Sequence, residues 1–343
     1  MLEILDTTLR DGEQTAGVSF NSSEKLAIAQ LLLEELKVDR IEVASARVSK
    51  GESEAFARIC EWASSKGYLD RVEVLGFVDG GESVDWIVAG GGKVVNILAK
   101  GSLKHLTKQL RKTTDEHISD IAKVVSYARS KGLTCNIYLE DWSHGMIESP
   151  EYVFELMDGL KELDIQHFML PDTLGILDPW STSEMCWKML RRYPDLHFDF
   201  HAHNDYGFAV ANSMAAVRAG FEGIHTTVNG LGERSGNASV AAVVASLSDM
   251  MPVKMRIDES KLTHVCKYVE SISGIRIPDN EPVVGENVFT QTSGGHADGD
   301  RKGSLYANQL LPERFGRVRE LSLGKMSVKA NIIENLDKLG ISL

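Results

Sequence analysis

The chain of 343 residues lacks the features of a disulfide-bonded, membrane-spanning or nucleic-acid-binding protein. Four cysteines are too far apart for a C-x-x-C pair, which excludes zinc sites and redox motifs of that type and predicts reduced packing thiols. No apolar run reaches membrane-spanning length. Because 37 Lys and Arg stand against 49 Asp and Glu, the net charge of −12 argues against nucleic acid or an anionic membrane as the main partner.

Signals for targeting and for nucleotide binding are also missing. The N-terminus enters a strand-like segment at Leu2 without a basic region or an apolar signal region, so we expect a cytoplasmic protein. The glycine-rich stretches 90–93 and 230–236 fit neither the dinucleotide nor the P-loop spacing. Neither stretch supports a nucleotide cofactor.

Short apolar runs alternate with longer amphipathic ones from residue 2 to about 250, which is typical of βα units around a parallel sheet. The predicted strands are 2–6, 39–44, 71–77, 93–98, 133–139, 167–170, 196–201 and 222–226. Helical patterns fill every gap, for example 24–37 and 150–163. Eight such units predict an α/β protein with a (β/α)8 TIM barrel.

The alternation stops near residue 252, which predicts a barrel at 1–252 and a small C-terminal subdomain at 253–343. We expect one helix at 258–273, a loop-rich region at 274–319 and a terminal helix near 327–339.

The chemistry of such barrels lies at the carboxyl ends of the strands, and many polar residues of this chain fall there. These residues are Arg10 and Asp11, Glu42, Tyr138 and Glu140, Asp172 and Thr173, His201 and His203, and the segment 229–237. We therefore expect them to meet at one rim.

His201 and His203 share one face of a strand, because side chains alternate with a period of two. With Asp11 they form a mixed nitrogen and oxygen set that suits zinc, manganese, iron or cobalt. Such a centre polarises a 2-oxo acid, and Arg10 could neutralise the oxyanion formed there. The alternatives are a partly buried histidine pair and a local ion pair between Arg10 and Asp11.

Glu140 and Asp141 end a strand among apolar neighbours, an environment that raises a carboxyl pKa toward the range of a general base. An acidic pair at a helix N-terminus explains the same pattern. Glu42, within a strand, has the same two explanations.

Three motifs resemble the acyl-CoA-condensing metallo-barrel family, which includes 2-isopropylmalate, homocitrate and citramalate synthases. They are L-D-T-T-L-R-D-G-E-Q at 5–14, H-A-H-N-D at 201–205 and N-G-L-G-E-R-S-G-N at 229–237. The resemblance extends over essentially the whole chain. It implies a divalent metal (Zn, Mn, Mg or Co), acetyl-CoA as co-substrate, and a homodimer with crossed small domains.

The resemblance also implies roles for individual residues. The metal ligands are Asp11, His201, His203 and Asn237, and the catalytic residues are Arg10, Glu42, Glu140, His296 and Tyr306. The substrate-binding residues are Arg10, Leu75, Leu98, Tyr138, Thr173, Asp298, Leu305 and Tyr306. Glu140 is the leading candidate for the base that removes a proton from the acetyl methyl group. His296 and Tyr306 are expected to reach the active site of the partner subunit.

Within the family, the chain most resembles the citramalate synthases, which use pyruvate and feed isoleucine biosynthesis. Leu75, Leu98 and Tyr138 would line a pocket sized for one methyl group, although they can also be packing at the barrel rim. 2-Isopropylmalate synthase is the first alternative. An acyl-CoA lyase or aldolase, and a non-catalytic binding protein, are two further alternatives.

Two departures from the family pattern, Gly295 and Ser235, leave the expected ligands intact. Family members usually continue beyond the point that corresponds to Leu343 into a regulatory domain, which we expect to be absent here.

Overall fold

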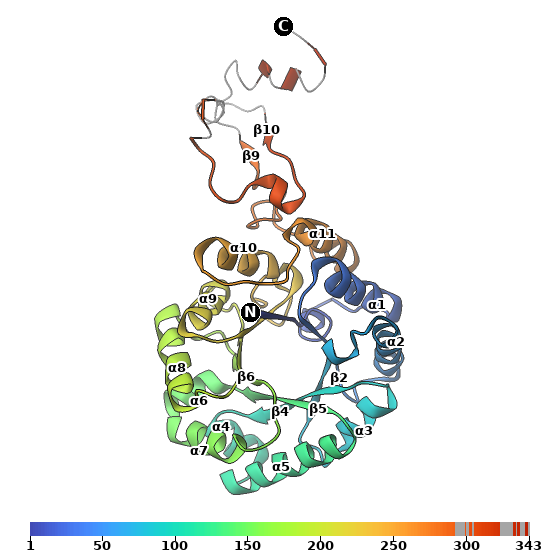
Figure 1. Ribbon diagram of the computed structural model, residues 1–343, viewed down its shortest axis with the longest axis vertical. Helices are drawn as coiled ribbons and strands as arrows, with labels where there is room; N and C mark the ends of the chain where they lie inside the picture. Colours follow the sequence, from blue (N-terminus) through green and yellow to red (C-terminus); the bar gives the residue numbers. More distant parts are fainter. Residues whose placement is uncertain are drawn as a thin grey trace.

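The computed structural model describes residues 1–291, 299, 302–303, 305–322, 332–333, 335–336 and 340–341. Eight parallel strands close into a barrel in the order of the sequence, and helices surround it (Figure 1). The predicted (β/α)8 barrel is therefore confirmed. The strands are β1 (Glu3–Asp6), β2 (Arg40–Ser45), β3 (Val72–Phe77), β4 (Val94–Lys100), β5 (Thr134–Glu140), β6 (Phe168–Asp172), β7 (Phe198–Ala202) and β8 (Gly223–Thr226).

The main helices around the barrel follow the strands in turn. They are α1 (Ser22–Gln30), α2 (Lys50–Lys66), α3 (Glu82–Ala89), α5 (Thr114–Ser130), α7 (Pro150–Leu160), α8 (Pro179–Arg192), α9 (Ala209–Ala219) and α10 (Val240–Met250). Two short helices, α4 (Leu103–His105) and α6 (Trp142–Glu148), lie in the loops after β4 and β5.

Helix α1 begins two residues before the predicted start at 24, because Asn21 caps it. The Asn21 side chain accepts from the N–H groups of Ser23 and Glu24, while the Glu24 carboxylate accepts from the N–H of Asn21. The helix continues as a π-helical segment, Leu31–Leu36, and ends at Lys37, whose φ is 63°. The predicted helical range of 24–37 is therefore confirmed, and the observed helix starts two residues earlier.

The hydrophobic core lies mainly between the sheet and the helices, and it includes all four cysteines, which are buried and free as predicted. A separate apolar cluster of Leu5, Leu75, Tyr138 and Met169 lies apart from it, with Leu98 packed against it. The barrel interior also contains buried polar side chains, namely Arg40, Glu42, Glu73, Asn96, Asn136, Asp199 and His225. The apolar cluster and these polar groups share the inside of the barrel.

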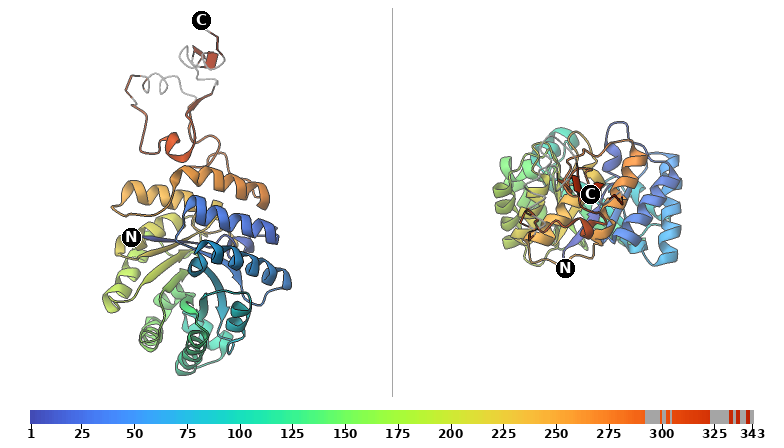
Figure 2. Two further views of the ribbon diagram at one scale, coloured as in Figure 1. Left: turned by 45° about the vertical axis from the view of Figure 1, so that its right-hand side comes forward. Right: turned by 90° about the horizontal axis from the view of Figure 1, so that it is seen from above.

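Helix α11 (Leu262–Ser273) follows the barrel and packs on it beside α1 (Figures 1 and 2). Its side chains Leu262, Val265, Cys266 and Val269 are buried in the same core as the barrel. Beyond it, β9 (Thr290–Gln291) pairs in parallel with β10 (Glu320–Leu321) away from the barrel. A subdomain starting at residue 253 remains a prediction, and much of the predicted helix at 327–339 lies outside the described residues.

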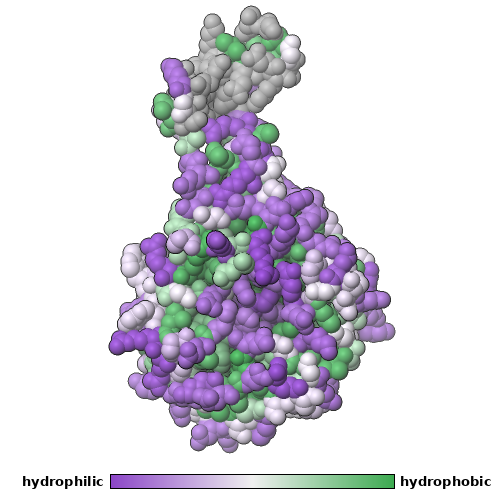
Figure 3. All heavy atoms as spheres, in the orientation of Figure 1, coloured by the Kyte–Doolittle hydropathy of each residue, from purple (hydrophilic) through white to green (hydrophobic). Residues whose placement is uncertain are grey.

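The face of the barrel seen in Figure 3 is mainly hydrophilic, with smaller hydrophobic areas between the charged side chains. None of the helices in the described part of the chain has the length and apolar character needed to cross a membrane.

Candidate active site

Arg10 and Asp11 lie in a tight turn that follows β1. The N–H groups of Arg10, Asp11 and Gly12 all donate to the carbonyl of Thr7, at 3.1, 2.8 and 3.1 Å. The buried Lys25 of α1 holds this turn from behind, since its Nζ donates to the carbonyl of Leu9 at 3.1 Å. The turn therefore projects the two side chains into the mouth of the barrel.

Lys25 connects the turn to the next βα unit as well. Its ammonium is 2.7 Å from Oε2 of Glu13, forms an ion pair with Glu52 of α2 and donates to the carbonyl of Val43 at 3.3 Å. A buried lysine with carboxylate partners on both sides fixes the relative position of these elements. This role could not be predicted, because Lys25 lies in an ordinary helical pattern.

Asp11, His201 and His203 come together as the sequence predicted. Nε2 of His201 is 3.0 Å from Oδ2 of Asp11 and 3.3 Å from Nε2 of His203. Nε2 of His203 is 3.8 Å from Oδ2 of Asp11, so the three atoms form a triangle. A divalent ion with bonds of about 2.1 Å needs ligand atoms roughly 3.0–3.4 Å apart. The distances from His201 Nε2 to the other two atoms lie in this range, and the distance between His203 Nε2 and Asp11 Oδ2 exceeds it by about 0.4 Å, so a small side-chain movement on these buried residues would complete a metal site.

The protonation of these groups also fits a metal. Burial, together with the neighbouring His201, lowers the pKa of His203 to about 4, and burial lowers the pKa of His201. Burial alone would raise the pKa of Asp11, but Arg10 and the two histidines hold it well below its ordinary value. Two neutral imidazoles and a carboxylate are the forms that bind metal.

Asn237 lies beside the triangle, because it pairs with His203 in an antiparallel bridge. Its Nδ2 donates to the carbonyl of Leu231 at 2.9 Å, which leaves Oδ1 buried and without a hydrogen bond from any described residue. Gly236 makes this loop possible, since its φ is 82° and a Cβ there would lie 1.9 Å from the carbonyl oxygen of Gly230. The glycines of 230–236 thus position an amide oxygen for the metal site.

Arg10 is held from below by Glu42 of β2. Nε of Arg10 donates to Oε2 of Glu42 at 2.5 Å, and the guanidinium lies 3.6 Å from Asp11. Asn96 donates to the other oxygen of Glu42 at 2.7 Å, and the Tyr138 hydroxyl is 3.4 Å from Oε2. In this arrangement Glu42 orients Arg10.

The hydroxyl of Tyr138 has polar neighbours, although its ring belongs to the apolar cluster. Its hydroxyl is 3.1 Å from Nδ1 of His225, whose Nε2 is 3.1 Å from Asp199. The Tyr138 ring stands edge-on to His201, with centroids 6.1 Å apart. Burial raises the pKa of Tyr138 well above its ordinary value, so it remains a neutral phenol.

Glu140 has a different environment from the one that the sequence predicted. It ends β5 directly opposite Lys100 of β4, and the two side chains form an ion pair. The expected apolar surroundings are wrong here, because the strand register brings a lysine to this position.

Thr173 lies at the same rim, after β6. Its Oγ1 accepts from the N–H of Asp141 at 2.9 Å, so the hydroxyl proton is available to a ligand. The carboxylate of Asp141 instead contacts Ser102, in the loop after β4, at 2.7 Å and His144, in its own loop, at 2.8 Å.

These side chains surround one cavity of about 190 Å³. The predicted residues in its lining are Arg10, Asp11, Leu75, Leu98, Tyr138, Glu140, Thr173, His201 and His203. The lining also includes Gln14, Pro171, Glu233 and Arg234, which sequence reasoning did not select although three of them lie within the quoted motifs. Arg234 binds Asp205 at 2.8 Å and the carbonyl of Thr173 at 2.8 Å, which ties the loop after β8 to the rim.

Leu305 and Tyr306, predicted in the C-terminal part, do not line this cavity within one chain. His296 and Asp298 lie outside the described residues. Leu305 and Tyr306 are exposed, and Tyr306 lines a separate hollow together with Phe289 and Arg319. Their predicted place in the partner's site remains a prediction.

Comparison with known proteins gives one family and several close relatives. A family model described as HMGL-like matches residues 1–269. The (R)-citramalate synthase of Methanocaldococcus jannaschii is 35% identical over 343 residues, which is 100% of this chain and 68% of that protein. 2-Isopropylmalate synthase 2 of Caldanaerobacter subterraneus is 34% identical over 98% of this chain and 85% of that protein.

Among solved structures, a hydroxymethylglutaryl-CoA lyase from Pseudomonas aeruginosa superimposes with a TM-score of 0.68 at 19% identity. The superposition covers 80% of this chain and 94% of that one. At this identity the likeness concerns the fold alone. The chain spans about two thirds of the length of the citramalate synthases that it matches.

Proposed function

Because the chain belongs to the HMGL-like family, we propose that it condenses acetyl-CoA with pyruvate and releases (R)-citramalate and CoA. The observation that carries this proposal is the meeting of Asp11, His201, His203 and Arg10 at one small cavity with an apolar wall. The 35% identity to a citramalate synthase over the whole chain supports the choice of substrate.

A divalent metal (Zn, Mn, Mg or Co) held by Asp11, His201 and His203, with Asn237 as a further or outer ligand, would polarise the ketone of the 2-oxo acid. Arg10 reaches the same cavity with its guanidinium oriented by Glu42 and Asp11. A fixed cation at this place stabilises the negative charge that develops on the ketone oxygen. The hydroxyl of Thr173 is available to donate to the substrate carboxylate.

Glu140 is the base in this proposal. Its carboxylate lines the cavity beside the predicted metal ligands and forms an ion pair with Lys100. Glu140 takes a proton from the acetyl methyl group of acetyl-CoA, and the resulting enolate carbon forms a bond to the ketone carbon of pyruvate, whose oxygen takes up a proton. Water then cleaves the thioester, which yields the free acid and the thiol of CoA.

In this proposal the apolar wall of the cavity determines which 2-oxo acid the enzyme accepts. Leu75, Leu98 and Tyr138 belong to one apolar cluster and line the cavity, and the methyl group of pyruvate would lie against them. 2-Oxoisovalerate is larger by two methyl groups, a difference worth about 1–3 kcal/mol in such a pocket. 2-Isopropylmalate synthase is nevertheless the second candidate, because a relative with that name is 34% identical over 98% of the chain.

The setting of the enzyme is also proposed. We place it in the cytoplasm, in isoleucine biosynthesis, as a homodimer. In that dimer the part after residue 252 crosses to the partner, so that His296 and Tyr306 complete the neighbouring site.

The test is a free-thiol assay on the full chain with acetyl-CoA, pyruvate and added Mn²⁺, with the product identified by mass spectrometry. A synthase releases thiol only when both substrates are present and forms citramalate. Thiol release without an oxo acid would indicate a thioesterase. Cleavage of citramalyl-CoA without net synthesis would indicate a lyase, and binding of pyruvate without turnover would indicate a non-catalytic protein.

A further inference from the structure

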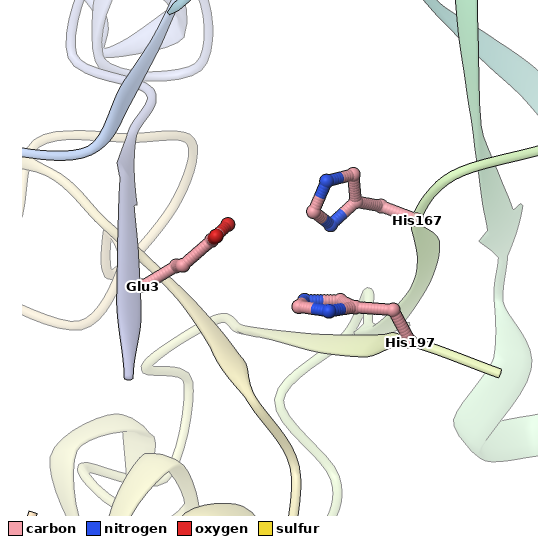
Figure 4. A group of neighbouring side chains, drawn as sticks. All are labelled: Glu3, His167 and His197. Atoms are coloured by element: carbon pink, nitrogen blue, oxygen red, sulfur yellow. The ribbon is translucent and has the colours of Figure 1, made fainter. Parts of the chain in front are cut away.

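A second group of metal-binding side chains lies at the end of the barrel opposite the cavity. Glu3 opens β1, while His167 and His197 immediately precede β6 and β7, so all three lie at the amino ends of strands. One possible ligand atom from each residue lies within 4.8 Å of the others. Figure 4 shows the carboxylate of Glu3 pointing toward the two neighbouring imidazoles.

The backbone holds these residues in place through the strands between them. The N–H of Glu3 donates to the carbonyl of Glu222 at 2.8 Å, and the N–H of Phe168 donates to the carbonyl of His197 at 2.9 Å. Gly223 of β8 leaves room beneath them, because a Cβ there would lie 1.9 Å from Oδ1 of Asp199. The group therefore rests on the ordered ends of the sheet.

Asp199 supports both imidazoles from inside the barrel. Its buried Oδ1 is 3.4 Å from Nδ1 of His167 and 3.0 Å from Nε2 of His197. A carboxylate behind a histidine fixes the ring and increases its basicity, an arrangement common behind metal-binding histidines. The second nitrogen of His197 faces Glu222 at 3.1 Å, an exposed carboxylate that solvent or a metal can replace.

The charges around this group are unbalanced. Four carboxylates lie here, those of Glu3, Glu73, Asp199 and Glu222. The guanidinium of Arg40 is shared among three of them, at 3.1, 3.0 and 2.5 Å. Before the two imidazoles are counted, the surplus is negative, which favours a divalent cation.

We propose that Glu3, His167 and His197 bind a second divalent ion of the zinc class. Two imidazole nitrogens and one carboxylate oxygen suit Zn²⁺ or Co²⁺ better than Mg²⁺ or Ca²⁺. A tetrahedral ion holds its ligand atoms about 3.4 Å apart, so the three side chains move closer together when it binds. Their partial exposure permits this movement and leaves space for a water ligand. The ion then joins β1 to β6 and β7 across the end of the barrel.

The experiment counts zinc on the full chain after chelator treatment, dialysis against ZnCl₂ and removal of any histidine tag. Wild type should retain two zinc ions per chain by mass spectrometry, and His203→Ala should retain one. His203→Ala combined with His167→Gln and His197→Gln should retain none. His203→Ala combined with His264→Gln should still retain one, because His264 is an exposed histidine near a glutamate outside the group.

Two further measurements keep the result interpretable if the histidine variants fold poorly. Glu3→Gln preserves size and both imidazoles, and in the His203→Ala background it should weaken zinc binding at least tenfold by competition with a chromophoric chelator. In that same background, ZnCl₂ should raise the Tm when Glu3 is present and much less when it is Gln. Retention of one zinc without His167 and His197, or no zinc on His203→Ala, would overturn the proposal. If the first site fails but the second exists, wild type would bind one ion and lose it with His167→Gln.

Discussion

Replacing Leu98 with alanine should widen the acceptor end of the cavity and shift the preference toward 2-oxoisovalerate. Leu98 is half-buried, lines the cavity and pairs in register with Tyr138 across β4 and β5. Truncation removes apolar volume where the larger acceptor would place its two extra methyl groups. Pyruvate loses contacts at the same place, so its own kcat/KM should fall modestly.

The size of the expected change in substrate preference follows from the two extra methyl groups that the widened cavity would bury. Burying two methyl groups at about 0.8 kcal/mol each gives about 1.6 kcal/mol, or roughly a 15-fold change in the ratio of kcat/KM for 2-oxoisovalerate over pyruvate. Because Leu98 is only half-buried, the stability cost should be at the low end of that for a core leucine, roughly 2 kcal/mol. Thermal unfolding of the variant checks that the fold survives.

The assay is steady-state thiol release with each oxo acid under saturating acetyl-CoA. Leu103→Ala is the matched control, because Leu103 lies in the loop after the same strand, is 40% exposed and does not line the cavity. Its ratio should equal that of wild type. An equal fall for both acceptors in Leu98→Ala, with an unchanged ratio, would refute the idea that this wall selects the substrate.

Three other outcomes are expected. His203→Ala should lose one equivalent of bound metal together with turnover, and normal metal content by mass spectrometry would disprove its role as a ligand. Glu140→Gln should lower kcat by roughly 10²–10⁴ with little change in the KM for pyruvate, and an unchanged kcat would exclude Glu140 as the base. Burial, with Lys112, lowers the pKa of the buried His117 to about 4 from 6.5. The unfolded state therefore takes up a proton first, and the His117 contribution to the unfolding free energy, complete above pH 6.5, falls by up to about 3 kcal/mol toward pH 4. In urea unfolding at pH 7 and pH 4.5, His117→Gln should lose less stability than wild type, whereas equal losses would contradict this reasoning.

The barrel was predictable because its pattern repeats. Each predicted strand overlaps its observed strand, and every boundary agrees within two residues. The side-chain direction inside the barrel was not predictable in the same way. Strands that are buried on both faces show no clear alternation of apolar and polar residues. The buried ionic group of Arg40, Glu73 and Asp199 could therefore not be predicted.

The predicted metal ligands meet because the carboxyl ends of parallel strands share one rim, which the sequence alone implies once the barrel is assumed. The side-chain pairs between neighbouring strands could not be predicted from the sequence. Lys100 faces Glu140 through the register of β4 and β5, and that register depends on packing of the whole barrel. Glu3, His167 and His197 could have been found by applying the same rule to the amino ends of the strands.

The most direct test of the central claim is the comparison of kcat/KM for pyruvate, 2-oxoisovalerate and 2-oxoglutarate with acetyl-CoA and a saturating divalent metal. We expect thiol release with pyruvate, together with citramalate, at a kcat/KM at least tenfold higher than that for 2-oxoisovalerate. A preference for 2-oxoisovalerate would contradict the small pocket formed by Leu75, Leu98 and Tyr138 and make the enzyme a 2-isopropylmalate synthase. No release with any of the three acids would contradict the proposed condensation itself.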